Sequence, residues 1–98
     1  MILARVVGTV VCNSRNDGLE GARYLLVEKT DQYGQKRGDY LVALDILGAG
    51  PDELVMVTEG SPSRETPLTI DKPIDALVVG IVDMIDENEK VIYRKYPS

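Results

Sequence analysis

The stretch ALVVGIVDMI, residues 76–85, decides what kind of fold this chain can form. It is the strongest strand signal in the sequence, because β-branched residues favour strands over helices. Gly80 stands in its middle, where a glycine weakens strand pairing unless the strand bends or another backbone comes close. A second stretch, Val6-Val7-Gly8-Thr9-Val10, repeats this arrangement. Two bent strands predict a curved, closed sheet.

The rest of the chain also shows strand patterns separated by turn residues. Residues 2–12 alternate between a wholly apolar face and a mixed face. Further short strands are expected at 24–29, 40–44, 53–59 and 91–95. The polar residues 86–89 form the turn of a C-terminal hairpin. Five or six short strands with almost no helical periodicity predict an all-β protein, either a small barrel or a sandwich.

One segment departs from the strand pattern. Residues 61–75 contain Pro62, Pro67 and Pro73, which exclude a long helix or a central strand. We expect an ordered loop that opens with one helical turn at 61–65. Arg64 in this loop carries a planar group with five hydrogen-bond donors, which suits the recognition of carboxylates or backbone carbonyls as well as simple solvation.

The strand expected at 76–85 is apolar on both faces. Leu77, Val79 and Ile81 would lie on one face, and Val78 and Val82 on the other. A single-layer barrel buries only one face of each strand, so the outer apolar face needs a cover. In so short a chain we favour a second subunit, and Ile81 is a candidate interface residue.

Composition limits the possible functions. The 98 residues carry 11 basic and 16 acidic side chains and no His, which gives a net charge of −5. We expect one domain, residues 1–98. The negative balance disfavours nucleic acid and anionic membranes. The N-terminus lacks the pattern of a signal peptide, no stretch is long enough to span a membrane, and the single Cys12 excludes a disulfide framework, so a cytoplasmic location is expected.

No enzymatic site is predicted. Without His there is no Ser-His or Cys-His dyad and no common zinc site, so we expect no catalytic residue, metal or cofactor. Asp45, Asp75 and Asp83 are more typical of turn and cap hydrogen bonding than of an acid-base pair. The sequence Gly48-Ala49-Gly50 lacks the remainder of a phosphate-binding loop and indicates a tight turn or a close approach of backbones.

Several separated motifs nevertheless match one family. The residues Asp45-Ile46-Leu47-Gly48-Ala49-Gly50 with Glu53, the group Gly60-Ser61 with Arg64, and the stretch 73–83 resemble the EutN/CcmL family of bacterial microcompartment vertex proteins. The opening residues 3–11 resemble the family too, and the likeness runs almost end to end. The sequence departs from the family pattern at two places. Family members often have glycine where this chain has Asp52, and often Ser-Ala where it has Pro62-Ser63.

The resemblance implies a specific architecture and role. It implies a five-stranded barrel of the oligonucleotide-binding (OB) type with a short helical turn, assembled as a homo-pentamer that caps the vertices of a shell in the cytoplasm. Its partners would be hexameric shell proteins. Gly48, Ala49, Gly50, Glu53 and Ile81 are then expected at the subunit interface or pore, and Ser61 and Arg64 in a loop that shapes the ring or its docking to the shell.

Two other classes of function are weighed against this one. An OB-type barrel could bind nucleic acid or a small ligand, since fold does not determine function. Tyr24, Tyr40 and Tyr93 could stack bases, yet no basic cluster larger than Lys36-Arg37 or Arg94-Lys95 accompanies them. An enzyme is the least favoured class, because no nucleophile or metal-ligand set is present.

Overall fold

The structure is a computed structural model that describes residues 1–11, 23–60 and 76–96. These residues form strands and no helix, so none of the described segments is a helix that could cross a membrane. The helical turn expected at 61–65 lies outside them. The strands are β1 (Ile2–Val10), β2 (Arg23–Thr30), β3 (Lys36–Asp45), β4 (Leu54–Glu59), β5 (Ala76–Ile81), β6 (Met84–Glu87) and β7 (Lys90–Arg94).

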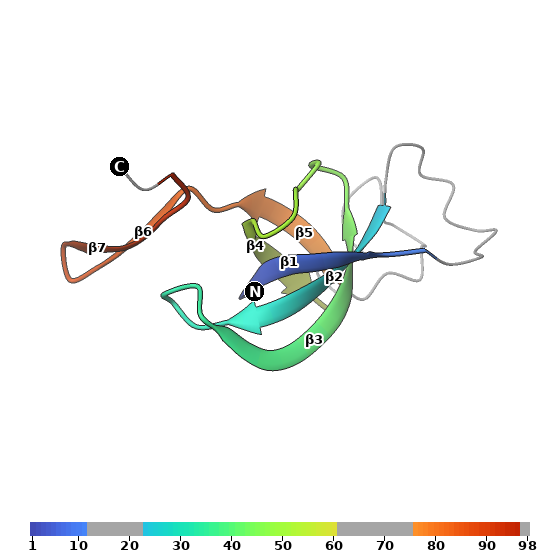
Figure 1. The fold of residues 1–98 in the computed structure, drawn as a ribbon, viewed down its shortest axis with the longest axis horizontal. Helices are drawn as coiled ribbons and strands as arrows, with labels where there is room; N and C mark the ends of the chain where they lie inside the picture. Colours follow the sequence, from blue (N-terminus) through green and yellow to red (C-terminus); the bar gives the residue numbers. More distant parts are fainter. Residues whose placement is uncertain (12–22, 61–75, 97–98) are drawn as a thin grey trace.

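The first five strands close into a barrel in the order β1-β2-β3-β5-β4 (Figure 1). Neighbouring strands are antiparallel except for β3 and β5, which are parallel and, among the described residues, pair at Leu44 and Leu77. Within this part of the chain, β3 and β5 thus have the fewest paired residues of any two neighbouring barrel strands. The predicted all-β fold with a closed five-stranded barrel is confirmed.

Both glycines predicted to bend strands lie at β-bulges. Opposite β2, the pairing of β1 passes from Val6 directly to Gly8, which leaves Val7 as an extra residue. Opposite β4, the pairing of β5 passes from Val78 to Gly80 and leaves Val79 as an extra residue. A bulge bends its strand and increases the local twist, as closing a small barrel requires. The two Val-Val-Gly stretches thus have the same structural role.

The barrel interior is filled by aliphatic side chains from every strand. The buried members are small or branched, which fits a narrow interior; they are Ala4, Val6, Leu25, Val27, Ala43, Ala49, Val55, Val57, Ala76 and Val78. A second cluster, made of Leu44 and Leu77 with the half-buried Tyr24, lies apart from this core. Its members occupy one row across β2, β3 and β5.

The single strand expected over 76–85 is wrong. Strand β5 ends at Ile81, opposite Val55, and the Val82 amide then donates a hydrogen bond to the Leu54 carbonyl, 2.8 Å away. The bulge at Val79 also changes which side chains share a face. Ile81 packs against the barrel core, as Val78 does, whereas Val79 is 41% exposed. Val79 and Ile81 therefore do not share a face, and Val79 is the more exposed of the two.

Strands β6 and β7 form the predicted C-terminal hairpin, which projects away from the barrel (Figure 1). Asn88 and Glu89 form its turn with φ of 53° and 66°, in the left-handed region. Met84 and Val91 are 51% and 42% exposed. The hairpin thus carries apolar side chains on its surface.

Candidate functional site

The described motif residues meet in the connection between β3 and β4, residues 45–53, which we call the glycine turn. It begins at Asp45, which is 1% exposed. The Asp45 carboxylate accepts hydrogen bonds from the Leu47 amide at 3.0 Å and the Ala49 amide at 2.9 Å. A carboxylate that binds amides two and four residues ahead fixes the backbone of a turn. The predicted turn role of Asp45 is confirmed.

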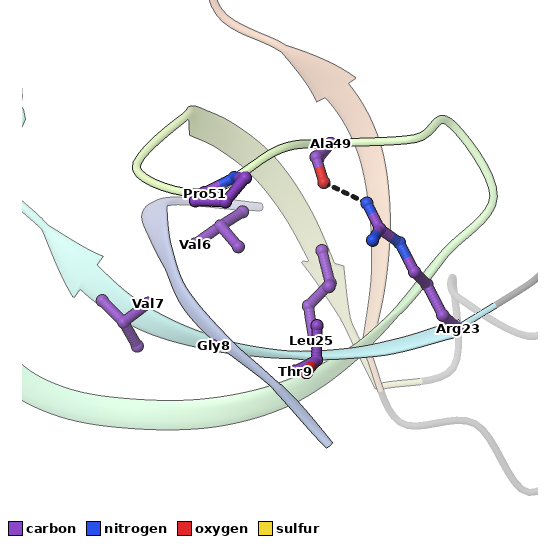
Figure 2. Close-up of a pocket in the computed structure, with 8 residues that line it drawn as sticks. All are labelled: Val6, Val7, Gly8, Thr9, Arg23, Leu25, Ala49 and Pro51. Carbon is purple, nitrogen blue, oxygen red and sulfur yellow. Dashed lines mark hydrogen bonds between the residues drawn. The ribbon is translucent and has the colours of Figure 1, made fainter. Parts of the chain in front are cut away.

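Arg23, at the start of β2, balances the charge of this buried carboxylate. Its Nε lies 3.5 Å from Asp45 Oδ2, and its guanidinium donates a hydrogen bond to the Ala49 carbonyl (Figure 2). A buried carboxylate without such partners would strongly destabilise the fold. Arg23 therefore joins the start and the middle of the glycine turn to the barrel wall.

The two glycines of the turn are needed for different reasons. Gly48 has a φ of +82°, which side chains disfavour, although an added Cβ would meet no atom within 4 Å. Gly50 lies outside the left-handed region, but an added Cβ would lie 3.2 Å from Glu53 Oε1. Asp52 has a φ of 66°. This left-handed backbone is one that aspartate tolerates better than most residues.

Glu53 connects the glycine turn to the C-terminal hairpin. Its carboxylate accepts a hydrogen bond from the Gly50 amide and pairs with the Lys95 ammonium. The bond from Lys95, followed by that from Gly50, lowers the pKa of Glu53, and the same pair raises the pKa of Lys95. Both side chains are about one-fifth exposed, 19% and 21%.

Arg5 forms a second connection between barrel and hairpin. Its Nε donates to the Gly34 carbonyl at 2.9 Å and its Nη1 to the Asp52 carbonyl at 2.8 Å. Its guanidinium also lies 5.5 Å from the centre of the Tyr93 ring in β7, a cation–π distance. We call Arg5, Glu53, Tyr93 and Lys95 the clasp. These four side chains attach the hairpin to the barrel.

A pocket of about 290 Å³ opens between β1, β2 and the glycine turn (Figure 2). Most of its wall is apolar, and Arg23 and Thr9 supply the polar groups. The lining residues are Val6, Val7, Gly8, Thr9, Arg23, Leu25, Ala49 and Pro51. The pocket and the glycine turn share Ala49 and Pro51, so they form one continuous surface.

The structure brings four predicted site residues together and separates a fifth. Gly48, Ala49, Gly50 and Glu53 all belong to the glycine turn, whereas Ile81 packs against the core from β5. Ser61 and Arg64 lie outside the described residues.

Sequence reasoning missed three basic side chains that hold this site. The hydrogen bonds and ion pairs of Arg5, Arg23 and Lys95 reach residues between 22 and 47 positions away in the chain. Of the three, Arg5 alone could have been recognised from the sequence, because it is a charged residue within a largely apolar strand. Among the described residues, no group of three or more Asp, Glu, Cys or His side chains could hold a metal ion.

The described residues thus form a closed barrel with a hydrogen-bonded turn, an apolar pocket and a projecting hairpin, and such a fold does not by itself determine function. Comparison with known proteins identifies the family. The profile of the family described as "Ethanolamine utilisation protein EutN/carboxysome" matches residues 1–83, and the chain belongs to this family.

Individual relatives cover almost the whole chain. The carboxysome shell vertex protein CcmL of Thermosynechococcus vestitus is 41% identical over 95 residues, which are 97% of this chain and 96% of that protein. The bacterial microcompartment shell vertex protein EutN of Salmonella typhimurium is 39% identical over 95 residues, again 97% of this chain and 96% of that protein.

Solved structures agree with the sequence relatives. The carboxysome subunit CcmL superimposes with a TM-score of 0.88 at 43% identity, covering 98% of this chain and all of that one. GrpN, described as a pentameric microcompartment shell protein from Rhodospirillum rubrum, superimposes with a TM-score of 0.77 at 39% identity, covering 89% of this chain and 99% of that one.

Proposed function

We propose that this protein is a structural shell protein that forms pentamers and caps the vertices of a bacterial microcompartment in the cytoplasm. The observation that carries this proposal is the end-to-end similarity to proteins named as shell vertex proteins, together with the fold shared with a pentameric shell protein. These relatives are named for a place in a shell and not for a reaction. The protein is accordingly a structural protein and not an enzyme.

The projecting hairpin supports assembly on physical grounds. An isolated two-stranded hairpin is at best marginally stable in water. Here Met84 and Val91 remain substantially exposed on it, although the clasp holds its base and the Tyr33 hydroxyl donates a hydrogen bond to Glu87, 3.4 Å away, beside its turn. A neighbouring subunit would cover these side chains, so we assign the hairpin to the subunit interface.

The glycine turn supplies the second part of the proposed interface. We place Gly48, Ala49, Gly50 and Glu53 beside the subunit junction or the five-fold axis, as the resemblance implies. The apolar contact first expected at Ile81 moves to Val79, which the bulge turns outward. Ser61 and Arg64 keep their proposed place in the loop that shapes the ring or docks it to the shell, and hexameric shell proteins are the proposed partners.

The rival nucleic-acid function lacks a binding surface in the described residues. Base stacking needs aromatic rings along one basic groove. Tyr24 packs with Leu44 and Leu77, Tyr93 lies under Arg5, and Tyr40 stands exposed on β3. The three rings therefore do not form one platform.

Reconstitution of shells tests the proposal. Hexameric shell proteins of a microcompartment would be produced with and without this protein and examined by electron microscopy. Closed polyhedra should form only in its presence, because flat hexagonal layers need five-fold corners to close. The variant Val79→Asp, which adds a charge at the proposed contact without entering the core, should fail to close shells. Equal closure without the protein, or its absence from purified closed shells, would contradict the proposal.

A further inference from the structure

Two large apolar side chains stand exposed on the glycine turn. Ile46 is 37% and Leu47 48% exposed. One exposed apolar residue needs no explanation, but these two are adjacent and lie on a fixed backbone. The Asp45 carboxylate holds the Leu47 amide on one side and the Ala49 amide on the other. A backbone fixed in this way loses little freedom on binding, which favours association.

The apolar pocket beside the same turn is a matching recess (Figure 2). Its volume of about 290 Å³ is about twice that of an apolar cavity of about 150 Å³ that holds benzene. A branched aliphatic side chain therefore fits its size. Val6, Leu25 and Pro51 give its wall the matching chemistry.

The exposed side chains of Ile46 and Leu47, which we call the projection, and the pocket, which we call the recess, are held by the same hydrogen-bond network. Arg23 lines the pocket, pairs with Asp45 and donates to the Ala49 carbonyl. Asp45 in turn fixes the segment that carries Leu47. The relative positions of projection and recess are thus set before any partner arrives.

A ring of identical subunits requires such a pair of different surfaces. In a head-to-tail interface, a patch on one subunit meets a different patch on the next. We propose that Leu47, flanked by Ile46, inserts into the pocket of the adjacent copy of this chain. This inference rests on the ring proposed above and adds the residues that form its contact.

The short distance between projection and recess determines where in the ring they lie. Leu47 and Ala49 are two residues apart, so their Cα atoms are separated by at most about 7 Å. A rotation of one-fifth of a turn moves a point by about 1.2 times its distance from the axis. This rotation carries one Cα position onto another about 7 Å away only when both lie roughly 6 Å from the axis, so the two surfaces meet across the junction only close to it. The contact would therefore surround the five-fold axis.

Site-directed cross-linking tests the contact. Cys12→Ser removes the single native thiol. In this background, one chain carries Leu47→Cys and a second carries Thr9→Cys in the pocket wall, and the two are produced together and oxidised. Because each chain has one thiol, a bond between positions 47 and 9 can form only between subunits. The matched control replaces Thr9→Cys by Val42→Cys, on β3, where the native side chain is 46% exposed.

We expect a covalent dimer that joins positions 47 and 9, identified by peptide mass spectrometry, and at least a tenfold lower yield for positions 47 and 42. A ring of five copies by native mass without the 47–9 bond would overturn the contact and leave the proposed function standing. Equal yields with Thr9→Cys and Val42→Cys would also overturn it. A folded monomer would overturn the ring and the contact together.

A charge substitution gives an independent readout in the chain with its native cysteine. Leu47→Glu should abolish the five-copy species while the far-ultraviolet circular dichroism stays unchanged, because this side chain is not part of the barrel core. Val42→Glu serves as the control at similar exposure and should retain the ring. Retention of the ring by Leu47→Glu at the same protein concentration would overturn the proposal.

Discussion

The barrel and the C-terminal hairpin differ in what holds them together. The barrel has a core of buried aliphatic side chains and hydrogen-bonded neighbours for each of its strands. The hairpin has two strands, exposed apolar side chains and the clasp at its base. The barrel is stabilised by its own core, whereas the hairpin leaves apolar side chains exposed among the described residues, and the proposed assembly would bury them.

The largest loss of unfolding free energy should come from a substitution in the barrel core. Leu25 is fully buried, and Leu25→Ala removes its contacts and leaves a cavity, which costs about 2–5 kcal/mol in the free energy of unfolding. Denaturant unfolding followed by circular dichroism would measure it. Val42→Ala, at a 46% exposed position, should change the same free energy by less than about 0.5 kcal/mol. Equal losses at both positions would contradict a self-sufficient core.

A smaller loss of unfolding free energy is expected from a substitution in the glycine turn. Asp45→Asn keeps the shape of the side chain but removes the charge that Arg23 balances and one of the two acceptors for backbone amides. We expect a loss of about 1–3 kcal/mol in unfolding free energy. The exposed Asp39 offers a matched control, since Asp39→Asn should change stability by less than about 0.5 kcal/mol. Similar values for the two variants would show that the buried network contributes little.

A smaller, local effect is expected at the clasp. Arg5→Lys keeps the charge but loses the planar fork that donates to two carbonyls and lies against Tyr93. Amide hydrogen exchange should show faster exchange in β6 and β7, by about tenfold, with unchanged protection in the barrel. Arg94→Lys, on the exposed side of the hairpin, is the control. Unchanged exchange in the hairpin of Arg5→Lys would contradict the role of the clasp.

The clasp also makes the hairpin sensitive to acid. The pKa of Glu53 is lower in the folded protein than its ordinary value of 4.5, so this group stabilises the folded state above that pH. The contribution is lost as the pH falls through the folded pKa. Hairpin exchange should therefore rise below about pH 4.5 relative to the barrel. Glu53→Gln should remove this difference in pH dependence, and its persistence in the variant would assign the acid sensitivity to another group.

The smallest effect on folding should come from the hairpin surface. Val91→Ala removes two methyl groups from a side chain that is 42% exposed, so the unfolding free energy of the dissociated subunit should change by less than about 0.5 kcal/mol. Thermal unfolding under dissociating dilution would measure it. A loss as large as that of Leu25→Ala would show that Val91 belongs to a folding core.

The parts of the fold that local patterns encode could be predicted from sequence. The Val-Val-Gly stretches indicated bent strands, and both lie at bulges. The end of β5 could not be predicted, because Ile81 and Val82 continue an apolar pattern while the chain leaves the sheet there. A bulge adds one residue to a strand, and no local rule shows that Val79 is the extra one. The placement of Val79 and Ile81 on one face of the strand was therefore wrong.

Only those residues of the candidate site that lie close together in the sequence could be predicted. Asp45 and the glycines of the turn lie within a few residues of one another, so turn chemistry identified them. The side chains that fix the site come from distant strands, as Arg23 and Arg5 do from β2 and β1. Their contacts depend on how the barrel closes, which residue spacing does not encode.

Native mass spectrometry of the full chain and of Val91→Asp tests most directly the claim that the hairpin is a subunit contact. We expect a five-copy species for the parent chain. For Val91→Asp we expect a monomer whose circular dichroism still shows a folded barrel, because assembly would bury the new carboxylate at the junction without a partner. A parent chain that is a folded monomer, or a Val91→Asp variant that assembles as fully as the parent, would contradict the claim.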